Sequence, residues 1–258
     1  MDSYLMRDGA PFGEEGWEKI DDMVVTVIRK NLVGRRFIEL VGPLGWGVEI
    51  APTFNFGQQD GAALATETGE YLRLQEIAQE FMLRAKHMAI ADDTPFALDL
   101  GAVALAATKL ADAEEEIVIG GLREAAEMSV ELTDWDTLGG PFKLVSKATA
   151  QLRASGFDAP FAVVMDPNMY ARLASLMRQG RREIEMVERI AEAGIFETTA
   201  LPEGEVLVVS PHAWNVDLVV GQDAVTAYLG NEGIDHRFRI FETLALRIKR
   251  PGAICVIE

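Results

Sequence analysis

Residues 34–46, which read Gly-Arg-Arg-Phe-Ile-Glu-Leu-Val-Gly-Pro-Leu-Gly-Trp, constrain the fold of this chain more than any other stretch. They directly follow residues 17–32, where apolar side chains recur at the spacing of one helix face. Gly34 stands where a helix C-terminal cap belongs, and residues 35–41 alternate as in a strand before a Gly-Pro turn. The sequence therefore predicts an amphipathic helix that passes almost without a linker into a strand and a tight turn.

A long hairpin is expected next. Residues 48–73 hold two extended runs on either side of a Gly-Gln-Gln-Asp-Gly tip at residues 57–61. From residue 74 to residue 85 the apolar side chains have helical spacing, which by itself indicates a helix. Residues 99–120 form an alanine-rich pattern with one apolar face, typical of a helix about 33 Å long at about 1.5 Å per residue.

The rest of the chain alternates irregularly between helix and strand. Asp166 before Pro167 has the composition of a helix start with its N-cap. We expect helices at 142–154, from 167 onward and at 183–193, and strands at 161–165, 206–210, 216–220, 238–249 and 254–257. This order lacks the regular strand–helix alternation of doubly wound nucleotide-binding folds, so the sequence predicts the α+β class.

The net charge of the chain limits the classes of molecule that it can bind. With 258 residues, 49% of them hydrophobic, the chain can bury a substantial core in one large domain or two small ones. Its formal net charge of -17 repels nucleic acid and anionic membranes, so neither is expected as a partner. The N-terminus lacks an export signal, and no apolar run reaches the roughly 18 residues of a membrane span, so we expect a cytoplasmic protein.

Residues with catalytic or metal-binding chemistry are sparse. The three histidines and the single cysteine are His87, His212, His236 and Cys255. The histidines show no metal-ligand spacing, and the cysteine stands in an apolar run typical of a buried strand. Asp112 and the glutamates at 114–116 suit either a hard cation or, as the favoured interpretation, a solvated or salt-bridged face. We therefore expect neither catalytic residues nor a metal site.

Residues 34–46, together with three later blocks, resemble the encapsulins. The later blocks are Gly221-Gln222-Asp223, Ala227-Tyr228-Leu229-Gly230 and residues 241–249, in an order and spacing that extend the resemblance over nearly the whole chain. Encapsulins are bacterial and archaeal proteins that assemble into closed cytoplasmic shells around cargo enzymes. The resemblance implies an α+β Hong Kong 97 phage-type major capsid fold with a peripheral domain, an extension loop and an axial domain. It also implies an icosahedral homo-oligomer of 60 or 180 copies that is a structural shell and not an enzyme.

The same resemblance divides the chain into segments. It places the N-terminal helix and the start of the peripheral domain at 1–47, the extension loop at 48–75, the peripheral domain with its spine helix at 76–133, the axial domain at 134–220 and the closing strands of the peripheral domain at 221–258. It also implies a strand up to about Phe81 and then a short helix, against the helical periodicity of residues 74–85. We follow the resemblance there, because periodicity alone misassigns many segments.

A luminal groove for cargo is implied where the N-terminal helix, the next strand and a segment near the C-terminus meet. In encapsulins such a groove captures a short Leu/Gly-rich peptide at the end of each cargo protein. The matching residues here are Ile28, Arg35, Glu39, Val41, Leu44, Thr226 and Tyr228. From the residues alone, the simplest interpretation of Arg35 and Glu39 is an ion pair within or between subunits.

A basic loop interrupts the acidic sequence between two expected helices. It consists of Arg178, Gln179, Gly180, Arg181 and Arg182. Taken alone it is a turn with solvated arginines, whereas the corresponding encapsulin loop lines the five-fold pore, where repeated arginines favour anions. The neighbouring Glu183 and Glu185 are expected to neutralise much of that positive field.

In the encapsulin family the enclosed cargo enzymes carry out the chemistry. The resemblance therefore implies that this chain encloses a ferritin-like iron oxidase or a dye-decolourising peroxidase, and that it has a role in iron storage or oxidative-stress defence. Some relatives bind flavin through a tryptophan close to the position of Arg84 or Ala85. No aromatic residue stands there, so we expect no cofactor. Two alternatives stay open: a phage or prophage major capsid protein of the same fold, and an enzyme of the protease or bacteriocin type.

Overall fold

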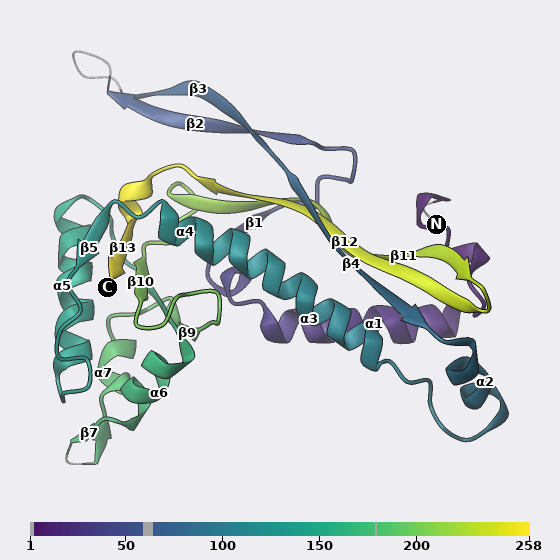
Figure 1. Cartoon of the computed structure of the whole chain (residues 1–258). Helices are drawn as coiled ribbons and strands as arrows, with labels where there is room; N and C mark the ends of the chain where they lie inside the picture. Colours follow the sequence, from purple (N-terminus) through teal and green to yellow (C-terminus); the bar gives the residue numbers. More distant parts are fainter. Residues whose placement is uncertain (1–2, 59–63, 179) are drawn as a thin grey trace.

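The structure is a computed structural model that describes residues 3–58, 64–178 and 180–258. Its described part is elongated. A long sheet with two helices on one face occupies one half, a compact unit of helices and short strands lies at the other end, and a two-stranded arm stands away from the sheet (Figure 1). The helix and strand content agrees with the α+β class expected from the sequence.

The long sheet has four strands in the order β1-β11-β12-β4. These strands span Glu39–Val41, Val216–Glu232, Asp235–Ile248 and Gln75–Leu83. β1 runs parallel to β11, and it pairs with only three residues of that strand, from Asp217 to Val219. Beyond them, the outer edge of β11 has no strand partner among the described residues.

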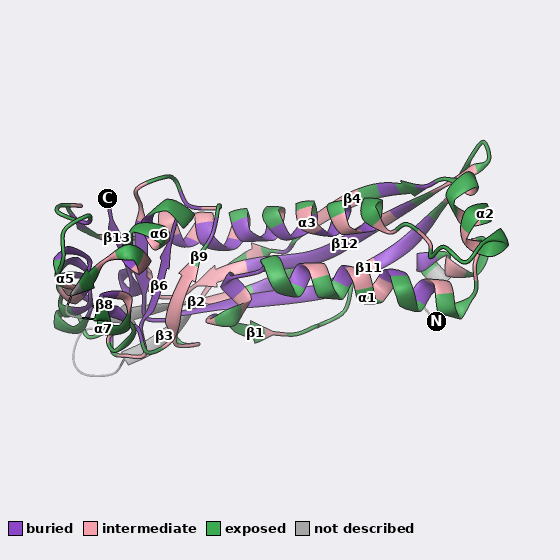
Figure 2. Ribbon diagram, turned by 90° about the horizontal axis from the view of Figure 1, so that it is seen from below, coloured by how far each residue is buried: buried purple, intermediate pink, exposed green. Residues whose placement is uncertain are grey.

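Two long helices cover one face of this sheet. They are α1, Glu14–Asn31, and α3, Gly101–Glu115, and each turns its buried side toward the strands (Figure 2). Trp17, Ile20 and Val24 of α1 pack with Leu110 of α3 and Phe238 of β12 in one apolar cluster. α3 continues through a π-helical turn, Glu116–Gly120, into α4, Gly121–Glu124, so the helix expected at 99–120 is confirmed and is longer than expected.

The arm is the hairpin expected from the sequence. β2, Ile50–Gln58, pairs antiparallel with β3, Leu64–Arg73, and the rest of the expected tip, from residue 59, lies outside the described residues. The chain then forms β4 and the short helix α2, Ala85–Asp93. The prediction of a helix at 74–85 from periodicity is therefore wrong, because residues Gln75 to Leu83 form an edge strand that pairs with β12.

The compact unit is built on a five-stranded sheet in the order β5-β13-β10-β6-β9. The strands span Met128–Val130, Ile254–Ile257, Val206–Val209, Ala162–Met165 and Gly194–Glu197. The helices are α5, Gly140–Ala154, α6, Pro167–Ser175, and α7, Ile184–Glu188. Asp166 caps α6 by accepting hydrogen bonds from two backbone amides, and Cys255 is buried in β13, both as expected.

Two elements differ in length from what the sequence predicted. The helix expected at 183–193 ends at Glu188, because the chain turns there to enter β9 through Gly194, whose φ of 117° lies in the region that favours glycine. The strand expected at 216–220 continues to Glu232, with bulges between Val220 and Val225. The domain boundaries inferred from the resemblance stay predictions.

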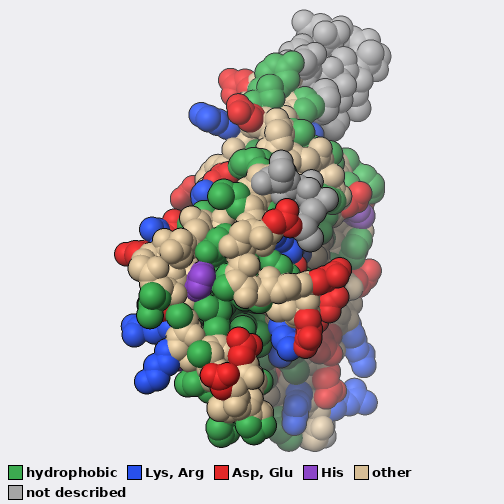
Figure 3. Space-filling model, turned by 90° about the vertical axis from the view of Figure 1, so that its right-hand side faces the viewer, with side chains coloured by type: hydrophobic (Ala, Val, Ile, Leu, Met, Phe, Trp, Pro, Cys, Tyr) green, Lys and Arg blue, Asp and Glu red, His purple; other side chains and the backbone are tan. Residues whose placement is uncertain are grey.

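Several large apolar side chains at the extremities of the molecule are exposed. Figure 3 looks onto the end that carries α2 and the N-terminus, where hydrophobic side chains lie among acidic and basic ones. Phe96, which follows α2, is 70% exposed, and Ile234, between β11 and β12, is 78% exposed. Tyr71 on the arm is 65% exposed. Exposed apolar side chains on projecting elements are typical of surfaces that meet other protein chains.

Candidate functional site

Two adjoining hollows run along α1 on the side that faces β11. The first, of about 380 Å³, is lined by Val25, Ile28, Arg29, Leu32, Arg35, Arg36, Leu40, Asp223 and Ala224. The second, of about 330 Å³, shares Val25 and Ala224 with the first and extends along the helix to Asp21. We call these two hollows together the α1 furrow. Apolar side chains of the helix form one wall, and the bulged part of β11 forms the other.

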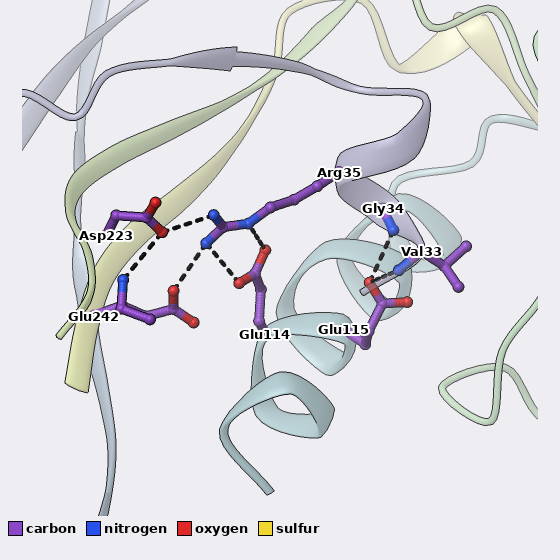
Figure 4. Close-up of polar contacts among 8 residues, drawn as sticks. Val33, Gly34, Arg35, Glu114, Glu115, Asp223 and Glu242 are labelled. Atoms are coloured by element: carbon purple, nitrogen blue, oxygen red, sulfur yellow. Dashed lines mark hydrogen bonds and ion pairs between the residues drawn. The ribbon is translucent and has the colours of Figure 1, made fainter. Parts of the chain in front are cut away.

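A cluster of four ionisable residues adjoins the α1 furrow, since two of them, Arg35 and Asp223, line its first hollow. Figure 4 shows the contacts among the four. Arg35 donates hydrogen bonds from Nε and Nη2 to the two carboxylate oxygens of Glu114, at 2.6 and 2.8 Å. Its Nη1 donates to Asp223 at 2.8 Å, and Nη2 also donates to Glu242 at 2.8 Å. The Glu114 and Glu242 side chains are both 1% exposed. One guanidinium thus ties α3, β11 and β12 together beneath the furrow.

This Arg35 cluster holds a proton at neutral pH. Burial, and then the negative charge of Glu114, raise the pKa of Glu242 to about 9. Burial opposes the charge of Arg35, but its hydrogen bonds and its attraction to Glu114 outweigh burial and raise the pKa of the guanidinium. The neutral Glu242 therefore shares the buried site with one cation and the carboxyl group of Glu114, whereas the Asp223 side chain contacts that cation from the exposed side. Oε1 of Glu242 has no hydrogen-bond partner within the described part of the chain.

Glu115 fixes the backbone next to this cluster. Its Oε1 accepts hydrogen bonds from the amides of Val33 and Gly34, both at 2.8 Å, and its Oε2 accepts one from the Thr198 hydroxyl at 3.2 Å. These bonds hold residues Gly34–Arg36 in a 3-10 helix. A Cβ atom on Gly34 would lie 2.6 Å from Val118 Cγ1, so the site requires glycine for close approach.

Two expectations for this region are wrong. Gly34 is not the C-cap of the first helix, which ends at Asn31 with Leu32 as its C-cap, and the strand expected at 35–41 is limited to Glu39–Val41. The physical reason is that the backbone amides of Val33 and Gly34 donate hydrogen bonds to Glu115. These two bonds hold the chain against α3 before it can join the sheet. The expected ion pair of Arg35 exists within the chain, but its partners are on α3, β11 and β12.

The structure brings only some of the expected groove residues together. Ile28 and Arg35 line the first hollow. Glu39 and Leu44 are exposed and Val41 is half-buried, and none of the three lines either hollow. The residues of the first hollow that sequence reasoning missed are Val25, Arg29, Leu32, Arg36, Leu40, Asp223 and Ala224. The spacing of residues 25, 28, 29 and 32 on one helix face was the signal that could have identified the first three of them.

Thr226 and Tyr228 of the expected groove are buried. Both lie on β11 with side chains 0% and 6% exposed, and the Tyr228 hydroxyl hydrogen-bonds Nδ1 of His236 at 2.9 Å. The N-terminal residues Ser3–Leu5 and Arg7–Gly9, in two short 3-10 helices, lie against this part of β11. The two residues are therefore covered and do not line the α1 furrow.

The basic loop lies at the tip of the compact unit. Met177–Arg178 and Arg181–Arg182 form the two short strands β7 and β8, Gly180 has a φ of 78°, and Gln179 lies outside the described residues. Arg181 and Arg182 are exposed. The expected neutralisation of this charge by Glu183 and Glu185 stays a prediction. The Glu183 carboxylate turns inward and accepts hydrogen bonds from the amides of Gly139 and Phe142 at the start of α5.

Neither a metal site nor a membrane span is found in the described residues. No group of three or more His, Cys, Asp or Glu side chains in the ranges above is placed to hold a metal ion, and no described helix is long and apolar enough to cross a membrane. Of the carboxylates at the end of α3, Glu114 is salt-bridged to Arg35, which agrees with the salt-bridged form of the expectation, whereas the buried Glu115 accepts hydrogen bonds and neither residue is solvated.

The family of the chain follows from comparison with known sequences. A family model described as "Encapsulating protein for peroxidase" matches residues 1–245. The type 1 encapsulin shell protein EncA of Myxococcus xanthus is 33% identical over 279 aligned positions, which cover 100% of this chain and 97% of the relative. A diheme-cytochrome-encapsulin shell fusion protein of Kuenenia stuttgartiensis is 31% identical, covering 95% of this chain and 73% of the relative.

Solved structures confirm the Hong Kong 97 phage-type capsid fold. A virus-like particle protein from Pyrococcus furiosus superposes with a TM-score of 0.82 at 23% identity, covering 95% of this chain and 100% of that one. The protein of Mycobacterium phage Che8 superposes with a TM-score of 0.62 at 14% identity, covering 88% and 91%. The phage likeness shows the fold alone, whereas the sequence relatives are named as shell proteins, so the enzyme alternative is not supported. The chain therefore belongs to the encapsulin shell proteins.

Proposed function

We propose that copies of this chain assemble in the cytoplasm into a closed icosahedral cage of 60 or 180 subunits around a cargo enzyme. The observation that carries this proposal is the match of the whole chain to shell proteins with a capsid-like fold. The exposed apolar side chains of the arm and of the α2 end support it, since a cage would bury such surfaces between neighbouring subunits.

Electron microscopy and native mass spectrometry of the purified protein test the assembly. We expect uniform hollow particles. A compact monomer or dimer over the accessible concentration range would refute it. Residual phage genes beside the coding sequence would favour the phage capsid alternative, which the fold alone does not distinguish.

The second part of the proposal is that the α1 furrow binds the C-terminal peptide of the cargo. Each hollow has room for apolar side chains, and Val25, Ile28 and Leu32 provide a continuous apolar wall. The exposed Arg29 and Arg36 and the carboxylate of Asp223 stand at its rim, where charges set the register and direction of a bound peptide. A Leu/Gly-rich peptide suits this surface, because leucine fills pockets and glycine allows close approach of the backbone.

Val25 gives the sharpest test, since its side chain is 41% exposed and lines both hollows. Val25→Asp should leave the shells intact and reduce loading at least tenfold, because it places an unpaired charge in an apolar pocket at a cost of about 2 kcal/mol. Thr26→Asp is the matched control, because it puts the same charge on the next, exposed residue of α1 outside the hollows. Loading is measured as fluorescence per shell after co-expression with green fluorescent protein that ends in the cargo tail. Equal loading of both variants would refute the groove.

The proposal extends to the contents and the pore of the cage. A ferritin-like or peroxidase cargo, and with it iron storage or oxidative-stress defence, is supported by the family description and by a ferritin-like-encapsulin shell fusion relative of Pyrococcus furiosus. The exposed Arg181 and Arg182 would line a five-fold pore that favours anions. The shell itself is assigned no cofactor, because no aromatic residue stands at position 84 or 85.

A further inference from the structure

Residues Ser3–Leu5 and Arg7–Gly9 lie against β11, on the part of this strand that β1 leaves unpaired. We call residues 3–9 the N-terminal strap. Leu5 is 5% exposed and packs on Ala227 and Phe241. Gly9 lies over Tyr228, since a Cβ atom built on this glycine would be 3.5 Å from the ring of Tyr228. The strap thus covers one side of the sheet edge with an apolar side chain and the other side with backbone.

Arg7 fastens the strap to α1. Its Nη1 and Nη2 donate hydrogen bonds to the two oxygens of Asp21 at 2.7 and 2.8 Å, and its Nε donates to the carbonyl oxygen of Thr226 at 3.0 Å. The guanidinium also lies 4.4 Å from the ring centre of Trp17. A single side chain therefore bridges the helix and the sheet edge.

The Arg7–Asp21 pair divides what would otherwise be one long channel. The second hollow of the α1 furrow ends at Arg7 and Asp21. A third hollow, of about 520 Å³, begins at the same two residues and continues past Glu18, Trp17 and Phe12 to the start of α1. With the pair opened, three hollows would join along the whole length of the helix. The pair stands as a partition and not as part of a packed core.

Side-chain contacts hold the strap in place. Besides the bonds that Arg7 donates, the indole Nε1 of Trp17 donates to the Arg7 carbonyl oxygen at 3.3 Å, and the Tyr4 ring stacks on Trp46. The Asp21 side chain is 39% exposed, so solvent weakens its ion pair with Arg7. Short 3-10 helices contribute little stability of their own. Beneath the strap, the buried Thr226 hydroxyl has no hydrogen-bond partner among the described residues. A bound peptide that replaced the strap could supply one.

We propose that the N-terminal strap is a displaceable latch, which a peptide bound in the α1 furrow lifts from β11 in order to reach Thr226 and Tyr228. The inference rests on the proposed cargo peptide in that furrow. Because only the open form gives access to the full channel, the latch reduces the apparent affinity for the peptide by the fraction of subunits in which it is open. The chain thereby sets how readily its own shell is filled.

Hydrogen exchange of wild-type shells, empty and loaded with the tagged fluorescent reporter, tests the latch without any substitution. We expect loading to protect residues 21–32 and to speed exchange of residues 3–9. Protection of residues 21–32 with unchanged exchange in the strap would overturn the latch and leave the groove standing. No protection of residues 21–32 would instead overturn the groove, and the latch with it.

A variant measures the size of the effect. Leu5→Ala combined with Arg7→Ala should raise the reporter loaded per shell at limiting reporter expression several-fold, as expected if the latch closes most subunits. Lys19→Ala is the matched control, since it removes a cation of α1 that pairs, within the described part of the chain, with the exposed Glu15 away from the furrow. Unchanged or lower loading of intact double-variant shells would contradict the latch. If the double variant forms no shells, hydrogen exchange of the wild-type shells decides whether the strap is displaced.

Discussion

Replacing Glu242 with glutamine should flatten the pH dependence of stability. The side chain is 1% exposed and shares a buried site with Glu114 and Arg35. Burial and the charge of Glu114 raise its pKa from 4.5 to about 9. The folded chain therefore keeps a proton that the unfolded chain releases above pH 4.5. The E242Q variant has an amide that does not titrate, and its carbonyl can still accept the hydrogen bond from Arg35.

The magnitude follows from linkage. A raised pKa means that the folded state binds the extra proton, so its contribution to stability is fully present below about pH 4.5 and falls as the pH rises toward 9. In that interval each pH unit lowers the free energy of unfolding by about 1.4 kcal/mol. Between about pH 5 and pH 8 the wild-type protein should therefore lose up to about 4 kcal/mol per subunit relative to E242Q.

Urea unfolding followed by tryptophan fluorescence measures this difference. Both proteins are unfolded at equal subunit concentration at each pH, and the difference between their free energies of unfolding is plotted against pH. Glu39→Gln is the matched control, because it removes an exposed carboxyl group from β1. Parallel curves for wild type and E242Q from pH 5 to pH 8 would refute the reasoning, since Glu242 would then not bind its proton in the folded state.

Two further substitutions follow from the same structure. Arg35→Leu leaves Glu114 and Glu242 buried without a cation, so we expect a loss of about 3 to 5 kcal/mol and no shells by size-exclusion chromatography and electron microscopy; wild-type yields of shells would contradict this. Exchange of both Arg181 and Arg182 for glutamine should leave assembly unchanged, because both side chains are exposed, and should slow several-fold the quenching of an enclosed fluorescent reporter by iodide; unchanged quenching would argue against an anion-favouring pore.

The periodicity of apolar residues was sufficient to predict the helices that pack one face on a sheet. The apolar positions of α1 and α3 predicted both helices and most of their buried residues, because a 3.6-residue repeat reports a single packed face. It failed at β4, where Phe81 and Leu83 are buried on a strand with an apolar pattern that also fits a helix. Only the resemblance to a family distinguished the two.

The Arg35 cluster could not be predicted from the spacing of residues in the sequence. Arg35 is separated from its partners Glu114, Asp223 and Glu242 by 79, 188 and 207 residues. No local pattern reports contacts at such separations. The adjacent Glu114 and Glu115 also looked like one acidic patch, although successive helix residues point about 100° apart and these two bind opposite sides of the N-terminal segment.

The place of β13 in the compact unit bears on how the chain is made. This strand lies between β5 and β10, although Ile254–Ile257 are synthesised after every other strand of that sheet. In a nascent chain, β5 cannot join β10 until β13 has left the ribosome. Chains broken off before residue 254 would lack the strand that joins the two, and so could not present a finished compact unit to their neighbours. Synthesis order thus gives a growing assembly a means of rejecting such chains.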